Sequence, residues 1–173
     1  MLEKDIFKKT EGRLYRYFKT LQQIKCFNLE CEELEKQKDR IRKDIRETNV
    51  FIEEESRAIT YEERVQTSSK KFSYAENEII KGIENLEKEW IYVRRKLLKR
   101  KAKIRELERQ IVPLKYNISM LSEESKKFIE WKYSQCKSVE WIANQMYGGA
   151  RATAYRKREE LVKSLIIWNN FYL

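Results

Sequence analysis

Histidine is absent from the chain, and its three cysteines, Cys26, Cys31 and Cys136, are an odd number that does not make up a paired disulfide framework. Without histidine, the usual zinc ligand sets and serine-histidine-aspartate triads cannot form. The sequence has no glycine-rich phosphate loop, and no paired acids fall in a predicted cleft. We therefore expect no enzymatic activity, no metal and no cofactor, and we expect the reduced thiols of an intracellular compartment.

Glycine and proline are also rare, since four glycines and one proline, Pro113, are all that interrupt the 173 residues. Turns between β-strands depend on such residues, whereas long helices tolerate few of them. No apolar run approaches the roughly 20 residues that a membrane span needs, and no signal peptide is visible. The sequence therefore predicts an all-α, cytoplasmic protein with no membrane partner.

Charge is abundant, with 38 Lys and Arg residues against 28 Asp and Glu residues and a formal net charge of +10. Such an excess favours polyanions as partners, either nucleic acid or an anionic membrane surface. Charged and apolar residues alternate in the first ten positions, which argues against membrane binding. Hydrophobic residues make up 41% of the chain and aromatic residues 12%, far more than a disordered polyelectrolyte carries. A folded protein that binds nucleic acid is expected.

A heptad rhythm of apolar residues begins in the middle of the chain and predicts one long helix with a partner helix. It comprises Ile83, Leu86, Trp90, Val93, Leu97, Ile104, Leu107, Ile111, Leu114, Ile118 and Leu121, with Arg100 at a charged seam position. We place this helix from about Tyr74 to about Ser119, with Ser73 and Glu76 as a capping box at its start. Pro113 predicts a kink or a break near Ile111.

A second seam lies upstream of the first. It runs through Phe27, Cys31, Leu34, Lys38, Ile41, Ile45 and Ile52. Asn28 is the expected N-cap of this helix, with acidic residues in its first turn, and a separate amphipathic helix is expected from Ile6 to Ile24. Residues 53–72 lose the rhythm and are expected to form a loop or a short helical excursion. The two seams are natural partners, as an antiparallel hairpin or as the coiled coil of a homo-oligomer.

The chain divides into three predicted segments: N-terminal helices and a loop at 1–72, a long heptad helix at 73–120, and a small helical domain at 121–173. Short capped helices replace the long heptads in the third segment. Ser122 and Ser138 are the expected N-caps of its first two helices. The expected fold is therefore all-α, with a long helical hairpin that resembles a coiled coil, followed by a small C-terminal domain.

The last two helices of this domain have the features of a helix-turn-helix. Gly148 and Gly149 supply the turn, because glycine reaches positive φ without a steric cost. Ala143 and Ala154 are small enough to let the flanking helices cross closely. A third helix is expected from Ala150 to Leu165, and its basic start is expected to be exposed.

An exposed basic helix of this kind fits the major groove of DNA. The candidate DNA-binding residues are Ser138, Arg151, Thr153, Tyr155, Arg156, Lys157, Arg158 and Lys163. Arginine at this helix start can bind guanine bidentately, while Lys157, Arg158 and Lys163 are expected to meet phosphates. Thr153 fits a phosphate or a thymine methyl group, and Tyr155 fits either a phosphate contact or packing beneath the helix.

The C-terminal residues resemble the region-four helix-turn-helix of sigma factors. The resemblance rests on Leu121-Ser-Glu-Glu, Phe-Ile-Glu-Trp-Lys-Tyr133, Ser138-Val-Glu-Trp-Ile-Ala143 and Ala152-Thr-Ala-Tyr-Arg156. Placed after a long charged helix, these residues look still more like the phage late-gene regulators of the RinA and ArpU type. That resemblance implies a phage-encoded transcription activator that works with RNA polymerase in the host bacterial cytoplasm.

One feature departs from the sigma pattern, in which a glycine follows the alanine by four residues. Here Tyr147 occupies that position and Gly148 comes one residue later. The turn is therefore expected to be one residue longer. It stays open which of Arg151, Ala152 and Thr153 points at the bases.

Two other functions compete with a transcriptional regulator that binds double-stranded DNA. A phage small terminase subunit also joins a helix-turn-helix to a coiled coil, but it recognises packaging-site DNA. An interaction protein that uses the coiled coil alone would not bind DNA. The basic run from Arg94 to Arg105 contains no acid, and it fits a solvated face and a DNA-backbone contact equally well.

The tryptophans and the last cysteine have simpler interpretations. Helical spacing favours burial in the core or an interface over base stacking for the tryptophans. They are Trp90, Trp131, Trp141 and Trp168. Cys136 is expected to be an inert, partly buried thiol.

Electrostatics are expected to supply most of the non-specific affinity for DNA. If the chain neutralises about six or more phosphates, raising the salt from about 50 to about 200 mM will weaken binding by orders of magnitude, because bound counterions are released. A titration of a labelled duplex at several salt concentrations measures this slope. A flat salt dependence would exclude the DNA-binding interpretation.

Overall fold

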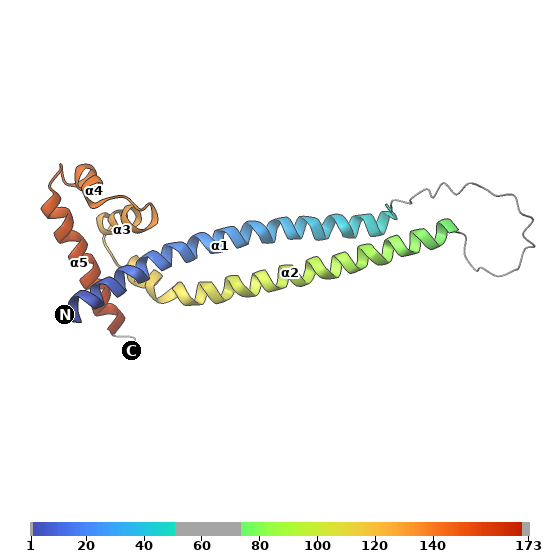
Figure 1. The fold of residues 1–173 in the computed structure, drawn as a ribbon, viewed down its shortest axis with the longest axis horizontal. Coiled ribbons are helices and arrows are strands. Elements are labelled where there is room, and N and C mark those ends of the chain that lie inside the picture. Colours follow the sequence, from blue (N-terminus) through green and yellow to red (C-terminus); the bar gives the residue numbers. More distant parts are fainter. Residues whose placement is uncertain (1, 51–73, 171–173) are drawn as a thin grey trace, which may run out of the picture. The chain divides into compact units, whose positions relative to one another are not determined.

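The computed structural model describes residues 2–50 and 74–170, and all secondary structure in these ranges is helical (Figure 1). The elements are α1 (Leu2–Glu47), α2 (Tyr74–Ser119), α3 (Glu123–Ile129), the π-helical turn η1 (Glu130–Ser134), α4 (Val139–Met146) and α5 (Arg151–Asn170). The expected all-helical class is confirmed. The capping residue Ser73, the end of the second seam at Ile52 and the expected loop at 53–72 lie outside the described residues.

Helix α1 is longer than expected, because it continues through the position at which we expected a new helix to start. Asn28 is an exposed residue inside α1 and not an N-cap. The prediction of two separate helices was therefore wrong. Buried Ile24 and Cys31 are seven residues apart, so the apolar seam passes Asn28 without losing its period. With no proline or glycine nearby, continuing the helix costs less than ending it and nucleating another.

Helix α2 begins at Tyr74 and ends at Ser119, as expected. Its seam is confirmed along its central part, where Val93, Leu97, Ile104, Leu107 and Ile111 are buried. Pro113 lies inside the helix, which continues to Ser119, so the expected break into two helices does not occur.

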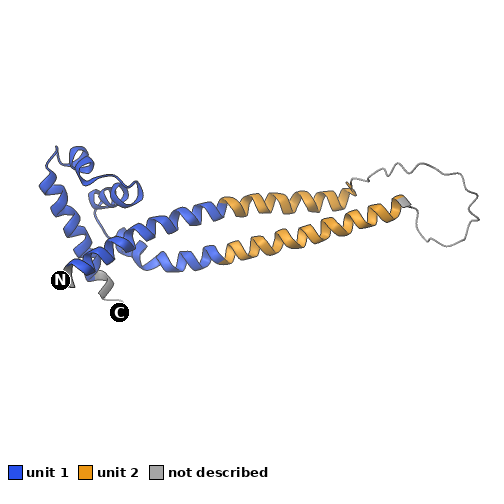
Figure 2. Ribbon diagram, in the orientation of Figure 1, with its two compact units in different colours: residues 1–28, 103–173 blue, residues 29–102 orange. Residues whose placement is uncertain are grey.

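The chain forms two compact units that do not follow its order in sequence (Figure 2). Unit 2 comprises residues 29–102 and contains the second part of α1 and the first part of α2, which lie antiparallel and side by side (Figure 2). We call the face of α2 that packs on α1 here the inner seam; it comprises Ile83, Leu86, Trp90, Val93 and Leu97.

Polar contacts fix the register of these two segments. The Arg100 guanidinium lies 2.8 Å from the Glu30 carboxylate, and the Lys101 ammonium group lies 2.5 Å from the carboxylate of Glu35. Arg100, the charged residue in the heptad rhythm of α2, therefore has a carboxylate partner within the same unit. Such pairs specify register more than they stabilise, because they remain partly exposed.

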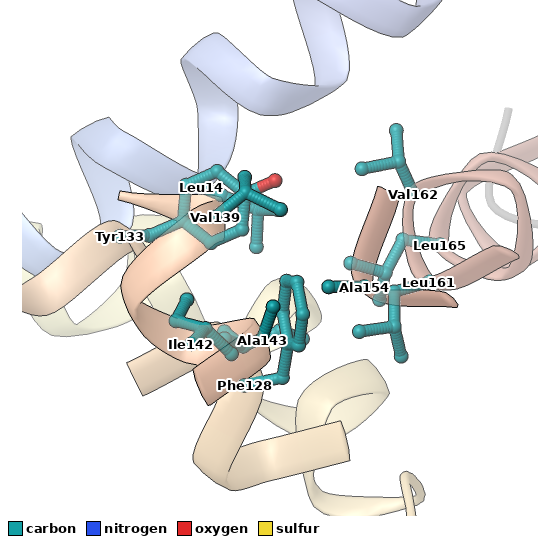
Figure 3. Packing of buried hydrophobic residues seen from close by; sticks show 11 residues of the cluster. Leu14, Phe128, Tyr133, Val139, Ile142, Ala143, Ala154, Leu161, Val162 and Leu165 are labelled. Carbon is teal, nitrogen blue, oxygen red and sulfur yellow. The ribbon is translucent and has the colours of Figure 1, made fainter. Parts of the chain in front are cut away.

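Unit 1 comprises residues 1–28 and 103–173 and holds the main apolar core. Figure 3 shows side chains from α3, η1, α4 and α5 meeting in this core, with Leu14 of α1 among them. Leu14, Phe128, Ile142 and Leu165 are completely buried. The start of α1 is thus part of the same core as the C-terminal helices.

None of the helices in the described part of the chain has an apolar stretch of the length that crossing a bilayer requires.

We expect the inner seam to carry much of the stability of unit 2. Leu97 is 5% exposed, so Leu97→Ala should lower the free energy of unfolding by about 2–5 kcal/mol through lost burial and a residual cavity. Leu29→Ala is the matched control, because Leu29 is 63% exposed in the same unit. Urea unfolding followed by circular dichroism measures both variants. Equal destabilisation by the two substitutions would contradict the packing of this seam.

Candidate nucleic-acid interface

The turn between α4 and α5 depends on two glycines in the left-handed region. Gly148 has a φ of +55° and Gly149 a φ of +87°. The carbonyl oxygen of Ala143 accepts hydrogen bonds from the amides of Tyr147, at 2.9 Å, and of Gly149, at 3.0 Å. These bonds satisfy a carbonyl group that the helix end would leave free. The expected glycine turn is confirmed, and α5 begins at Arg151.

Helices α4 and α5 approach each other at two small residues. Ala143 of α4 and Ala154 of α5 are both completely buried in the core of unit 1. Next to them the Tyr155 hydroxyl donates a hydrogen bond of 2.5 Å to Glu140, the second residue of α4. This bond lowers the pKa of Glu140 and raises the pKa of Tyr155. The Tyr155 hydroxyl therefore joins the two helices, while its ring stays exposed.

Serine side chains cap α3 and α4, as expected. Ser138 Oγ accepts a hydrogen bond from the Trp141 amide at 3.1 Å, and Ser122 Oγ accepts one from the Ser125 amide at 3.4 Å. Each cap satisfies a free amide in the first turn of its helix. Ser138 is exposed at the start of α4, where other amides of the first turn are available to an anion.

Exposed basic residues occur along α5, and two of them define the face that points away from the core, here called the outward face. Arg151, Arg156 and Lys163 are exposed, whereas Thr153 and Lys157 are half-buried. Arg156 and Lys163 are seven residues apart, about two helical turns, and so lie on one side of α5. The buried residues Ala154 and Leu161 lie on the opposite side.

The outward face also holds Ala152, one of the three residues considered for base contact, and Glu159, which was missed. Ala152 and Glu159 are exposed and lie four residues before and three residues after Arg156, spacings that place them next to it on a helix. That spacing was the signal available in the sequence. Lys137, directly before the Ser138 cap, was missed too; its ammonium group lies 5.2 Å from the centroid of the Trp141 ring.

Arg158, expected at a phosphate, is placed differently from the other cations of α5. Its Nε and Nη2 donate hydrogen bonds of 2.7 and 2.6 Å to the two carboxylate oxygens of Glu11 in α1. The Tyr133 hydroxyl of η1 donates a third bond of 2.7 Å to Glu11 Oε1. The guanidinium also lies 5.4 Å from the centroid of the Phe7 ring. Arg158 thus joins α5 to the start of α1.

Glu11, Tyr133 and Arg158 form a cluster, here called the Glu11 cluster. Burial and hydrogen bonding act in opposite directions on the pKa of Glu11. The side chain of Glu11 is 13% exposed and that of Arg158 is 26% exposed. Burial raises the pKa of Glu11, but the hydrogen bonds from Arg158 and Tyr133 outweigh it and leave the pKa below its ordinary value of 4.5. The bond from Arg158 to Glu11 raises the pKa of Arg158, and burial raises that of Tyr133. The carboxylate is therefore ionised at neutral pH.

The remaining expectations have mixed outcomes. Trp90 and Trp131 are half-buried, and the Trp131 and Trp141 rings meet edge to face with centroids 5.2 Å apart. Trp141 is itself exposed, and the side chain of Trp168 lies outside the described residues. Cys136 is exposed, so the expectation of a partly buried thiol was wrong. Cys136 lies two residues after the end of η1 and has a φ of +54°.

The chain was compared with protein-family models, with curated proteins and with solved structures, and nothing in the three comparisons matches it.

The Glu11 cluster predicts a pH-dependent contribution to stability. Glu11→Gln should lower the free energy of unfolding by about 1–3 kcal/mol at pH 7, because Arg158 loses its ionic partner in a mostly buried place. Because folding depresses the pKa of Glu11, its contribution is complete above the unfolded-state value near 4.5 and is lost as the pH falls through the lower folded-state value. Urea unfolding at pH 7 and at about pH 3 measures the loss.

The fully exposed Glu33 provides the control, since its carboxylate also has a cationic partner, Lys36. Glu33→Gln should leave the stability near that of the wild type at both pH values, because exposed pairs contribute little. A Glu11→Gln variant that unfolds like the Glu33→Gln variant at pH 7 would show that the cluster does not stabilise unit 1.

Proposed function

We propose that the protein is a sequence-specific DNA-binding regulator of transcription, in which α4 and α5 form a helix-turn-helix and α5 is the recognition helix. The observation that carries this proposal is the outward face of α5. Arg156 and Lys163 are exposed there, on a helix whose opposite face is buried in the core of unit 1. Arg151 is exposed in the first turn of α5, about 140° around the helix from Arg156. In this proposal the antiparallel parts of α1 and α2 form a helical hairpin that precedes the DNA-binding domain.

The start of α5 has the dimensions and chemistry that a recognition helix needs. An α-helix with its side chains is about 10–12 Å wide and fits the major groove of B-DNA, which is about 12 Å wide. Arg156 has a planar guanidinium that matches the O6 and N7 acceptors of guanine. Arg151 enters with the first turn, where recognition helices contact base edges. Thr153 and Tyr155 lie at the sides of this face.

Phosphate contacts are assigned to cations farther along the helix and at the start of α4. Lys163 lies two turns beyond Arg156 and keeps its ammonium group at the surface. Lys157 lies beside Arg156 on α5, and Lys137 directly precedes the exposed start of α4 at Ser138, which offers backbone amides to a phosphate. Arg158 is left out of the interface, because Glu11 neutralises it.

Glu159 refines the expected readout, because it is an acid on an otherwise basic face. An acidic side chain beside the groove accepts a hydrogen bond from the cytosine N4 amino group and is repelled by phosphates. We therefore place Glu159 at a base edge next to the one that Arg156 reads. A cytosine close to a guanine in the preferred site would agree with this assignment.

The promoter and polymerase parts of the proposal come from the resemblance to phage late-gene regulators. A reporter placed behind the selected DNA site tests them. Activation that depends on Arg156 supports a regulator acting with RNA polymerase, whereas a site that binds the protein without changing transcription, together with stimulation of a packaging ATPase, supports the terminase alternative.

Two substitutions on α5 separate base reading from phosphate binding. The duplex that the protein prefers is first selected from a random-sequence pool and compared with a scrambled duplex. Arg156→Ala should cost about 1–3 kcal/mol of binding free energy on the selected duplex and relax preference at one base pair, because a bidentate contact is lost. Lys163→Ala should weaken both duplexes alike and reduce the salt slope by about one.

Lys25→Ala is the control, since it removes one exposed cation from α1 and should not change the base preference. If Arg156→Ala weakens the selected and the scrambled duplex equally, Arg156 is not a base reader and Arg151 becomes the residue to test. If none of the variants changes DNA binding, α5 is not the recognition helix.

A further inference from the structure

Helix α2 carries a second apolar pattern on the flank next to the face that packs on α1. Within unit 2 its large exposed apolar residues are Ile80, 42% exposed, Ile91, 43%, Tyr92, 64%, and Leu98, 56%. Scattered exposed apolar residues are normal on protein surfaces. Ile80, Ile91 and Leu98, however, lie on one line along the helix, because their spacings of eleven and seven residues are multiples of the helical repeat.

Charged residues complete this line to an unbroken 4-3 rhythm. We call it the outer seam; it comprises Ile80, Glu84, Glu87, Ile91, Arg94, Leu98 and Lys101. Apolar residues in such a rhythm are typical of the contact line between two helices. The outer seam lies about a quarter turn around α2 from the inner seam. Lys101 at its end is paired with Glu35 of α1, whereas Ile80, Ile91 and Leu98 are exposed and can contact a helix from elsewhere.

A hollow beside the outer seam gives that helix a place to dock. It has a volume of about 720 Å³ and is lined on α2 by Ile91, Leu97 and Leu98. Lys38 and Arg42 of α1 and Arg94 of α2 also line it, against the single carboxylate of Glu87. An apolar floor with a surplus of cations fits a helix that brings apolar and acidic side chains together.

The order of charges along the outer seam identifies such a helix within the chain itself. Its acids, Glu84 and Glu87, precede its cations, Arg94 and Lys101. Two parallel copies would place like charges opposite each other, which is unfavourable. Two antiparallel copies place Glu84 opposite Arg94 of the second copy, and the same register places Ile80 opposite Leu98 and Glu87 opposite Ile91.

We propose that two copies of the protein associate antiparallel through the outer seams of their α2 helices. The contact is isologous, so each pairing occurs twice about a two-fold axis. It contains two apolar layers of Ile80 with Leu98, two ionic layers of Glu84 with Arg94, and two mixed layers of Glu87 with Ile91. The partner's acidic residues meet the cations that line the hollow. This association does not depend on the proposed DNA binding.

The ionic layers allow a charge-swap test on the full chain. Sedimentation velocity over a range of concentrations should show a reversible monomer–dimer equilibrium for the wild type. Glu84→Arg and Arg94→Glu should each weaken dimerisation at least about tenfold, because each places two like-charge pairs in the contact. A mixture of the two variants should form heterodimers, since both ionic layers are then attractive again. The double variant should dimerise for the same reason.

Lys99→Glu is the matched control, because it makes the same change of charge as Arg94→Glu at an exposed position of α2 off the outer seam. It should dimerise like the wild type. Circular dichroism of each variant checks that the helices form, and the mixture tests the contact even where one variant loses stability. Recovery of the dimer in the mixture supports the proposal.

Three results would overturn the proposed antiparallel dimer. A wild type that stays monomeric at the highest concentration reached has no such contact. A dimer that neither Glu84→Arg nor Arg94→Glu weakens uses another surface. Single variants that stay monomeric when mixed show that Glu84 and Arg94 do not face each other across the interface.

Discussion

The packing of the start of α1 against the C-terminal helices is the constraint on which the candidate interface depends. Leu14 is completely buried among residues of α3, η1, α4 and α5. One turn earlier, Glu11 joins Arg158 of α5 and Tyr133 of η1 through three hydrogen bonds. Two of the C-terminal helices, α3 and α4, are short, with seven and eight residues. Without α1 their apolar faces would not be fully covered, so α1 completes the unit that carries α5.

This arrangement divides the charges of α5 into two sets with different physical roles. Arg158 faces inward, where the Glu11 carboxylate neutralises it. The three charge-assisted hydrogen bonds that Glu11 accepts from Arg158 and Tyr133 compensate the loss of solvation. Arg156 and Lys163 face outward and keep their charge at the surface. A recognition helix benefits from both, because the inward pair fixes the orientation in which the outward side chains are presented. In the proposed complex with DNA, fewer rotational states would then have to be lost.

Local signals in the sequence predicted local structure well. The bounds of α2, the serine caps at Ser122 and Ser138 and the Gly148-Gly149 turn depend on residues within a few positions of one another. The predicted helix start at Asn28 was wrong, because it relied on a local capping signal alone. A cap is a preference worth about 1 kcal/mol, and the continuous burial of Ile24 and Cys31 on either side outweighs it.

The pairing of Glu11 with Arg158 could not be predicted, because 147 residues separate the two in sequence. No periodicity or spacing marks one glutamate among the 28 acidic residues as the partner of one arginine. Leu14 was assigned to an amphipathic helix, but nothing in its neighbourhood indicated which helices it would meet. Candidate DNA contacts were therefore chosen by residue type and position on α5 alone, and that choice could not separate Arg158 from Arg156.

The two seams of α2 differ in a way that assigns them different kinds of contact. Along the inner seam, Val93 and Leu97 are almost completely buried, and burying such side chains contributes about 1.5–3 kcal/mol each. That contact is made within the chain, where no loss of translational freedom opposes it. Four of the seven residues of the outer seam are charged, so it buries less apolar area and must also offset the entropy of bringing two molecules together. A reversible dimer that responds to concentration and salt follows from this balance, and the order of its charges selects the antiparallel orientation.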